Sequence, residues 1–347
     1  MGFTEVAVVM VCVMIPSVRV ISDAMRTKEG GVATATAKYV LGGLYTSDRT
    51  LAYTRLAIGA FQTWLVLERI FFSKVGVLCN KGSGCINMGG KNILTTFTVW
   101  NWVLQSLFFL TTGAIGLLSP KAKAKVPRRA FFTLWVMFEV LFATALLVSI
   151  VVWAVILPKL NAVEASGDFD PVQMALRKKM FWGRFGLCAH ILNVVFMVGD
   201  GVLNRMSLVR AHAPFALLFG CIYVFFSWGL FHRNQFWHYE FLDYRKSDAV
   251  VPYLALPAVL LAAFLLSSKF LRLTSKFLNV LKAGTASSDK GQKSTPRGRS
   301  SEISGGRSPL VSPSKPRASA LAATTPKRRR SKSIGMPKKK RGASPAP

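Results

Sequence analysis

Long apolar runs set the pattern of hydrophobic and polar positions along this chain of 347 residues, 51% of which are hydrophobic. Several runs reach the roughly 20 residues that an α-helix needs to cross a bilayer. We therefore predict an all-α, polytopic membrane helix bundle. Its six core helices are expected at residues 55–73, 93–118, 130–156, 181–202, 214–232 and 250–271.

A shorter apolar run, from Val6 to Ser22, precedes these spans and contains Pro16. It fits either a signal anchor or a signal peptide cleaved near residues 22–24. No positively charged segment precedes the run, which favours a retained anchor over a cleaved leader. Residues 25–54 would then form a cytosolic linker, and residues 55–272 would form the six-helix transmembrane domain.

Two predicted helices each carry a row of polar side chains. The rows are Thr98, Asn101 and Gln105 in one helix, and His190, Asn193 and Asp200 in the other. Offsets of three, seven and ten residues return to nearly the same angle on a helix with 3.6 residues per turn. Polar groups at membrane depth face a protein interior or a wet cavity. Both rows should therefore point inward and share one pocket.

The two rows hold the residue types of a nucleophile and its base. A threonine hydroxyl becomes nucleophilic when a neutral imidazole takes its proton, so Thr98 and His190 are the candidate catalytic pair. Side-chain N–H groups of Asn101 or Asn193, one turn away, are candidate donors to the oxyanion. Asp200 lies roughly 15 Å along the helix from His190, too far for a hydrogen bond, so we expect it to anchor its helix to a neighbour.

The distribution of lysine and arginine predicts the orientation in the membrane. Basic residues collect in loop 119–129 and before the second apolar run, where they include Arg49 and Arg55. Cytosolic loops carry such an excess, so both segments and the C-terminal tail should be cytosolic. Loops 74–92, 157–180 and 233–249 would be lumenal, in the endoplasmic reticulum or a related endomembrane.

Other polar residues of the core have simpler expected roles. The segment after the fifth span offers His232, Trp237, His238 and Tyr239 as candidate residues of the pocket rim. Glu139, inside the third core span, is expected to make a structural contact between helices.

The cysteines and histidines do not form a metal-ligand pattern. Cys79 and Cys85 flank a short loop, and a disulfide between them is permitted if that loop is lumenal. Cys12, Cys188 and Cys221 lie in apolar runs and behave as small hydrophobic residues. The four histidines lack the spacing of a di-iron desaturase, so we expect neither a metal nor a cofactor.

Four segments carry motifs in a fixed order. They are Phe97–Phe109, with a threonine seven residues before a glutamine; Leu157–Leu160; His190–Asp200, with a histidine ten residues before an acid; and a Trp-x-Tyr-x-Phe-Leu region at residues 237–242. In these segments the chain resembles the androgen-induced and androgen-dependent membrane proteins, which are multi-pass threonine hydrolases of fatty acid esters of hydroxy fatty acids (FAHFAs). The resemblance implies a lipid ester as substrate, Thr98 as nucleophile and His190 as base.

The chain also departs from this family. Phe185–Ala189 replaces a Trp-Leu-Asn-His stretch before the catalytic histidine, and the N-terminal run and the tail have no counterpart. Thr95 and Thr96 are alternative nucleophiles, and Thr98 is preferred because it keeps the spacing to Gln105. The other interpretation of the polar rows is a non-enzymatic membrane protein, either a lipid binder or transporter, or a scaffold.

After Arg272 the composition changes. Residues 273–347 hold 18 Lys+Arg against Asp289 and Glu302, in a stretch rich in Ser, Pro, Gly and Ala. Such a segment is expected to be disordered. In a multi-pass protein its basic clusters fit anionic lipid headgroups better than nucleic acid, and phosphate at Ser-Pro sites such as Ser308 and Ser312 would weaken that contact. The alternative is a solvated, unregulated tail.

Overall fold

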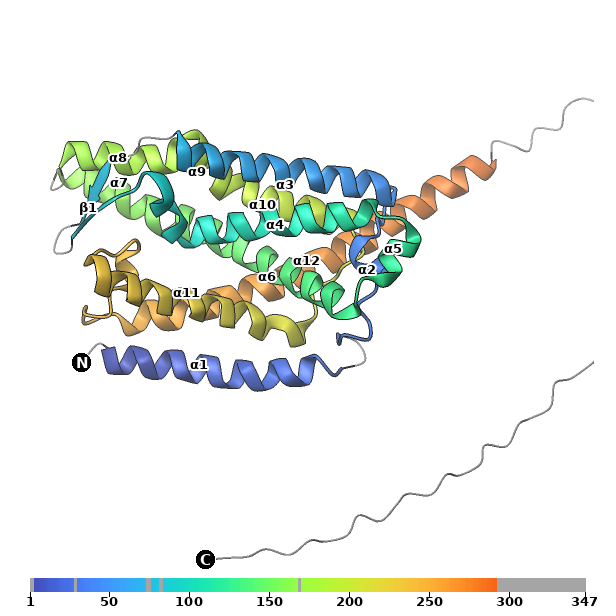
Figure 1. Cartoon of the computed structure of the whole chain (residues 1–347), viewed down its shortest axis with the longest axis horizontal. Helices are drawn as coiled ribbons and strands as arrows, with labels where there is room; N and C mark the ends of the chain where they lie inside the picture. The colour runs from blue at the N-terminus through green and yellow to red at the C-terminus, as the bar shows by residue number, and fades with distance from the viewer. Residues whose placement is uncertain (1–2, 28–29, 73–75, 81–83, 168–169, 292–347) are drawn as a thin grey trace, which may run out of the picture. The chain divides into compact units, whose positions relative to one another are not determined.

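The computed structural model describes residues 3–27, 30–72, 76–80, 84–167 and 170–291, and within them the all-α prediction is confirmed. Seven helices make up the main bundle in this part of the chain (Figure 1). They are α1 Phe3–Ala24, α3 Asp48–Phe71, α4 Phe97–Leu117, α6 Arg128–Val151, α10 Asn193–Leu203, α11 Ala213–Asn234 and α12 Val250–Gly291.

Five helical segments are long and apolar enough to cross a membrane, which indicates an integral membrane protein. They are Phe3–Ala24, Arg128–Ser166, Arg184–Leu203, Arg210–Asn234 and Val250–Leu281. Helices α3 and α4, with 24 and 21 residues, are long enough but are not among the five. Helix α3 carries Arg55, Gln62 and Glu68, and α4 carries Asn101 and Gln105 among its apolar residues.

Short elements close the two ends of the helical unit. At one end lie the antiparallel pair β1 Val77–Cys79 and β2 Cys85–Asn87 with α7 Leu157–Ser166, α8 Pro171–Trp182 and α9 Arg184–Leu187. We call this the hairpin end. At the other end lie α2 Ala37–Leu41 and α5 Pro120–Lys125, and we call it the α5 end (Figure 1).

The predicted loop 157–180 is largely helical, so that expectation is wrong. Helix α6 continues through a π-helical turn, Val152–Ile156, directly into α7. Pro158 follows this π-helical turn, at the second residue of α7. Asp170 then caps α8 by accepting a hydrogen bond from the Val172 N–H at 3.0 Å, and Pro171 follows it.

The end of the last span also differs from the prediction. Helix α12 does not stop near residue 271 but continues to Gly291, so residues 273–291 are helical where disorder was expected. Leu273, Phe277 and Leu281 recur at four-residue spacing in this extension, the apolar periodicity of a helix. The rest of the predicted disordered tail, residues 292–347, lies outside the described residues.

Helices α3 and α4 pack closely because small residues line their contact. A side-chain carbon added at Gly113 would lie 2.9 Å from the Ala52 carbonyl oxygen, and one at Gly59 would lie 2.8 Å from the Leu110 side chain. Both separations are too short for a real Cβ atom, so glycine is required at both positions. Small residues allow such backbone approach between membrane helices.

The N-terminal helix is an integral part of this packing. Helix α1 contacts α11 and α12, and it buries Val6 and Met10 completely or nearly so. Its first ring, Phe3, lies 5.3 Å from the Trp228 ring at the hairpin end. Helix α1 therefore shares one hydrophobic core with α11 and α12.

Candidate active site

A cavity of about 460 Å³ lies at the hairpin end. Its walls come from α4, the π-helical turn after α6, α7, α8 and the segment around residues 236–241. Both Thr98 and His190 line it, so the structure brings the two predicted catalytic residues to one cavity. In the described chain no hydrogen bond directly joins their side chains.

A second π-helical turn, Cys188–Leu192, presents His190 to this cavity. Turns of this kind interrupt the regular α-helical ladder and are frequent at functional sites. The backbone carbonyl of His190 accepts a hydrogen bond of 2.6 Å from the Ser149 hydroxyl, which fixes the turn against α6. The imidazole Nδ1 is buried without a hydrogen-bond partner among the described residues. An unsatisfied ring nitrogen of this kind is available to a ligand.

Thr98 lies in the first turn of α4, which Thr96 caps with its hydroxyl. The Thr98 side chain is largely buried, and the Tyr239 phenol lines the same cavity. Burial raises the pKa of Tyr239, so the phenol keeps its proton at neutral pH and remains a donor. The site therefore contains a hydroxyl, a phenol and an imidazole.

The two alternative threonines are held differently. The Thr96 hydroxyl donates to the Ile93 carbonyl at 3.1 Å, and the Thr95 hydroxyl donates to the Asn92 carbonyl at 2.5 Å. Thr95 Oγ1 also lies 2.6 Å from His238 Nε2, a contact that orients the His238 ring. Thr96 lines the cavity, whereas Thr95 is not among the lining residues.

Asn101 and Asn193 belong to a buried network between helices and do not line the cavity. The Asn101 amide donates to Asn193 Oδ1 at 3.1 Å, and the Gln105 amide donates to the same oxygen. Gln62 of α3 donates to Gln105 at 3.0 Å, and Thr144 of α6 donates to Asn101 at 2.8 Å. The amides thus join α3, α4, α6 and α10, and this engagement removes Asn101 as a ready oxyanion donor.

Of the four predicted rim residues, His238 and Tyr239 line the cavity, whereas Trp237 and His232 do not. His238 lines it, and burial lowers the pKa of its imidazole to about 4, so the ring is neutral. Trp237 instead stacks on Phe231 at 4.5 Å in the core. His232 is exposed, and its Nε2 lies 3.4 Å from the Tyr244 hydroxyl.

Cationic side chains that the sequence analysis did not single out also line the cavity. They are Arg69 of α3, Lys159 of α7 and Arg177 of α8. Lys159 forms an ion pair with Glu240 at 3.0 Å, and Arg177 donates to the Cys79 carbonyl at 2.9 Å. These residues come from three separate elements. Lys159 lies in the Leu157–Leu160 segment, but no local sequence motif marks Arg69 or Arg177.

The β-hairpin closes this end of the cavity. Cys79 and Cys85 are paired across its two strands and form a disulfide, as their spacing permitted. The Asn80 amide donates to the Trp237 carbonyl at 2.7 Å, and Arg177 donates to Asn80 Oδ1. The hairpin is thereby attached to α8 and to the segment that follows α11.

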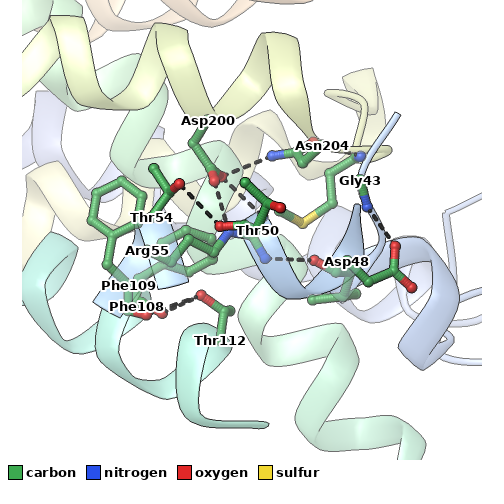
Figure 2. Close-up of polar contacts among 12 residues, drawn as sticks. Gly43, Asp48, Thr50, Thr54, Arg55, Phe108, Phe109, Thr112, Asp200 and Asn204 are labelled. Atoms are coloured by element: carbon green, nitrogen blue, oxygen red, sulfur yellow. Dashed lines mark hydrogen bonds and ion pairs between the residues drawn. The ribbon is translucent and has the colours of Figure 1, made fainter. Parts of the chain in front are cut away.

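Asp200 anchors α10 to α3, as expected, and its partner is Arg55. The guanidinium contacts both carboxylate oxygens, at 2.6 and 3.0 Å, and donates to the Val40 carbonyl at 3.1 Å (Figure 2). Asn204 donates to the same carboxylate at 2.8 Å. Arg55 is 1% exposed, so its assignment to the charged flank before the first core span is wrong.

Glu139 also makes the structural contact that was expected of it. Its two carboxylate oxygens face the Val209 N–H at 2.6 Å and His212 Nδ1 at 2.5 Å. The other ring nitrogen of His212 contacts the Gly30 carbonyl at 2.8 Å. This fully buried group ties α6 to the segments before α2 and α11, and it lies apart from the cavity lining.

Within the described chain, no group of three or more His, Cys, Asp or Glu side chains could hold a metal ion. The cavity instead offers a hydroxyl, imidazoles, a phenol and cationic side chains. A comparison of the chain with protein-family models, with curated proteins and with solved structures finds no match.

Proposed function

We propose that the protein is an integral-membrane hydrolase of lipid carboxylic esters, with Thr98 as nucleophile and His190 as base. The observation that carries the proposal is the shared cavity: Thr98 lines it, and His190, which also lines it, keeps one ring nitrogen buried and unpaired within the described chain. The resemblance to the FAHFA hydrolases, which rests on residues 97–109, 157–160, 190–200 and 237–242, supports the same assignment.

The reaction follows from the chemistry of these groups. His190 takes the proton of the Thr98 hydroxyl as its oxygen bonds to the ester carbonyl carbon. The tetrahedral intermediate expels the alcohol, which receives that proton, and leaves an acyl-threonine. Water then gives a proton to His190, attacks the acyl carbon and releases the fatty acid, and the proton returns to Thr98. Catalytic hydrogen bonds that are long without substrate tighten when it binds.

The negative charge of the intermediate needs a hydrogen-bond donor. Tyrosine hydroxyls serve this role in other enzymes, and Tyr239 lines both cavities that Thr98 lines. We assign the oxyanion contact to Tyr239 because Asn101 donates to Asn193 and neither amide lines the cavity.

The proposed topology has the α5 end in the cytosol and the hairpin end in the lumen of the endoplasmic reticulum or a related endomembrane. Five basic residues in the segment around α5 support the first assignment, and the Cys79–Cys85 disulfide supports the second. The burial of Val6 and Met10 against the bundle supports retention of α1 as an anchor.

A fluorophosphonate probe that reacts with activated hydroxyl groups tests the assignment. It should label the purified protein and fail to label Thr98→Ala. Thr96→Ala is the matched control, because Thr96 lines the same cavity two residues away, and it should still be labelled. Labelling that persists in Thr98→Ala and disappears in Thr95→Ala or Thr96→Ala would identify a different nucleophile. No labelling of the wild type would favour a non-enzymatic lipid binder.

A further inference from the structure

Thr98 lies at the junction of two cavities. Besides the larger one, a second cavity of about 90 Å³ is lined by α1, α4, α6, α11 and α12. Five residues line both spaces: Thr98, Val152, Ile156, Tyr239 and Phe241. A group bonded to the Thr98 hydroxyl can therefore extend in two directions.

The two cavities differ in chemistry. The larger one holds Arg69, Lys159, Arg177 and two histidines. In the smaller one, apart from Thr98, the side chains are aliphatic or aromatic with Met10 and Cys221, and no charged residue lines it. One side of the nucleophile thus suits a polar or anionic group, and the other suits hydrocarbon.

We propose that the smaller cavity is the acyl-binding site and that it selects esters of medium-chain fatty acids. This inference rests on the proposed function. With the ester carbonyl at Thr98, the acyl chain enters the apolar cavity, and the alcohol portion, with its polar end, occupies the larger one. A volume of about 90 Å³ is several times the roughly 10–15 Å³ that one water-sized group needs, so the cavity has room for several chain carbons.

Helix α11 sets the depth of this site. Gly220 lines the cavity, and a carbon added there would lie 3.5 Å from the Leu260 side chain, an ordinary contact. A larger residue at this position would fill the space without a backbone clash. Gly229 lies on the same helix, is exposed and meets nothing within 4 Å, so it offers a matched control.

Photolabelling tests the site independently of catalysis. The probe is octanoic acid with a diazirine at its methyl end, applied to full-length Thr98→Ala in detergent, with and without excess octanoic acid. The labelled residues are mapped by mass spectrometry. We expect competable labelling of the segments of α11 and α12 around Cys221 and Leu260, which line the cavity. Adding Gly220→Leu should lower it at least about tenfold, the effect of blocking a hydrocarbon pocket.

The control and a second variant make the outcome decisive. Gly229→Leu should keep the labelling, and Leu217→Trp, which narrows the same cavity from another position, should reduce it. Labelling elsewhere, or equal labelling in Gly220→Leu and Gly229→Leu, would overturn the inference. Octanoyl ester hydrolysis by the Thr98-containing protein, measured in parallel, separates the two claims: hydrolysis without the expected labelling refutes the acyl site, and labelling without hydrolysis refutes the proposed function.

Discussion

Two sets of buried polar residues serve different purposes in this protein. In the first, Arg55, Asp200 and Asn204 satisfy one another, and Glu139 and His212 do the same. Every buried side-chain nitrogen and oxygen of these five residues has a partner in the described chain. We call this set the paired set, and it connects helices.

The second set, at the candidate active site, is incomplete. His190 has an unpaired ring nitrogen within the described residues, and Thr98 and His190 border a cavity. An unpaired buried polar atom costs folding free energy, so it persists where a ligand can satisfy it. The comparison teaches that polarity at membrane depth does not by itself indicate a function. Asn193 Nδ2 and Gln62 Oε1 of the amide network are also unpaired within the described residues, so what sets His190 apart is an unpaired nitrogen on a residue that lines the cavity.

The largest expected effect is the loss of hydrolysis when a residue of the second set, Thr98 or His190, is replaced. Thr98→Ala and His190→Ala should each abolish hydrolysis, and the loss for His190 should be roughly 10²- to 10⁴-fold in kcat, the contribution of a general base. The double variant should be no worse than either single variant, because the two residues act as a unit. Kinetics on a lipid ester measure this, and thermal unfolding should show that all three variants remain folded. Additive losses would mean that the two residues act separately.

Replacing a residue of the paired set should lower the stability of the fold and leave the rate of hydrolysis unchanged. Arg55→Met leaves the Asp200 carboxylate buried and unpaired, and should lower the free energy of unfolding by about 3 to 5 kcal/mol. Adding Asp200→Leu should restore part of that loss, because it removes the uncompensated charge. Chemical or thermal unfolding in detergent is the measurement. Hydrolysis per folded molecule should stay within error of the wild type, and a selective loss of kcat would contradict the distinction between the two sets.

Four of the six predicted core spans coincide with helical segments that are long and apolar enough to cross a membrane, because continuous apolar runs mark them. The fifth span was expected at residues 214–232 and runs from Ala213 to Asn234, with a proline in its first turn. The partner of Asp200 could not be found, because Arg55 is 145 positions away and pairing at that separation leaves no local pattern. The same limit hid Arg69 and Arg177, which reach the cavity from different helices.

The candidate site was predictable in its two central residues and less so in their surroundings. Helical spacing and the resemblance together placed Thr98 and His190 on inward faces. Spacing also placed Asn101 and Asn193 there, but it cannot say whether an inward amide meets a cavity or another amide. The π-helical turn around His190 has no sequence marker, and it rotates the following residues relative to a regular helix.

The free energy of unfolding should depend on pH because of His238, which lines the cavity. Burial lowers the pKa of His238 to about 4, below the value near 6.5 of an unfolded chain. The unfolded state therefore binds an extra proton between these values, so stability should fall as the pH drops from about 6.5 to about 4. The loss should reach about 3 kcal/mol. Unfolding measured across this range should lose that dependence in His238→Gln, and an unchanged profile in the variant would refute this origin.

The hairpin disulfide should contribute less to the free energy of unfolding than the Arg55–Asp200 pair or the pH effect of His238. Cys79 and Cys85 are six positions apart, and closing so short a loop is expected to stabilise the fold by about 2 kcal/mol through the entropy of the unfolded chain. Replacing both cysteines with serine should lower the unfolding temperature, and a reducing agent should have the same effect on the wild type. A reducing agent that also destabilises the serine variant would point to another target.

The smallest expected effect on catalysis concerns the tail. Residues 292–347 carry 15 Lys+Arg against Glu302 alone. Deleting them should leave hydrolysis unchanged, because all proposed site residues precede them. Binding of the full chain to anionic vesicles should weaken with deletion, with rising salt and with aspartate at Ser308 and Ser312. Salt-insensitive vesicle binding, or a loss of kcat on deletion, would contradict this separation.

The close packing of α3 and α4 bears on how the chain enters a membrane during synthesis. Neither helix is among those apolar enough to insert alone, and α3 carries Arg55 at a buried position. Their partners are nevertheless within reach, since Gly59 and Gly113 allow the backbones to meet and Gln62 bonds to Gln105. We expect the two helices to leave the translocon together as one hairpin, with Gln62 and Gln105 already paired before lipid surrounds them, and Arg55 to gain its partner Asp200 when α10 follows.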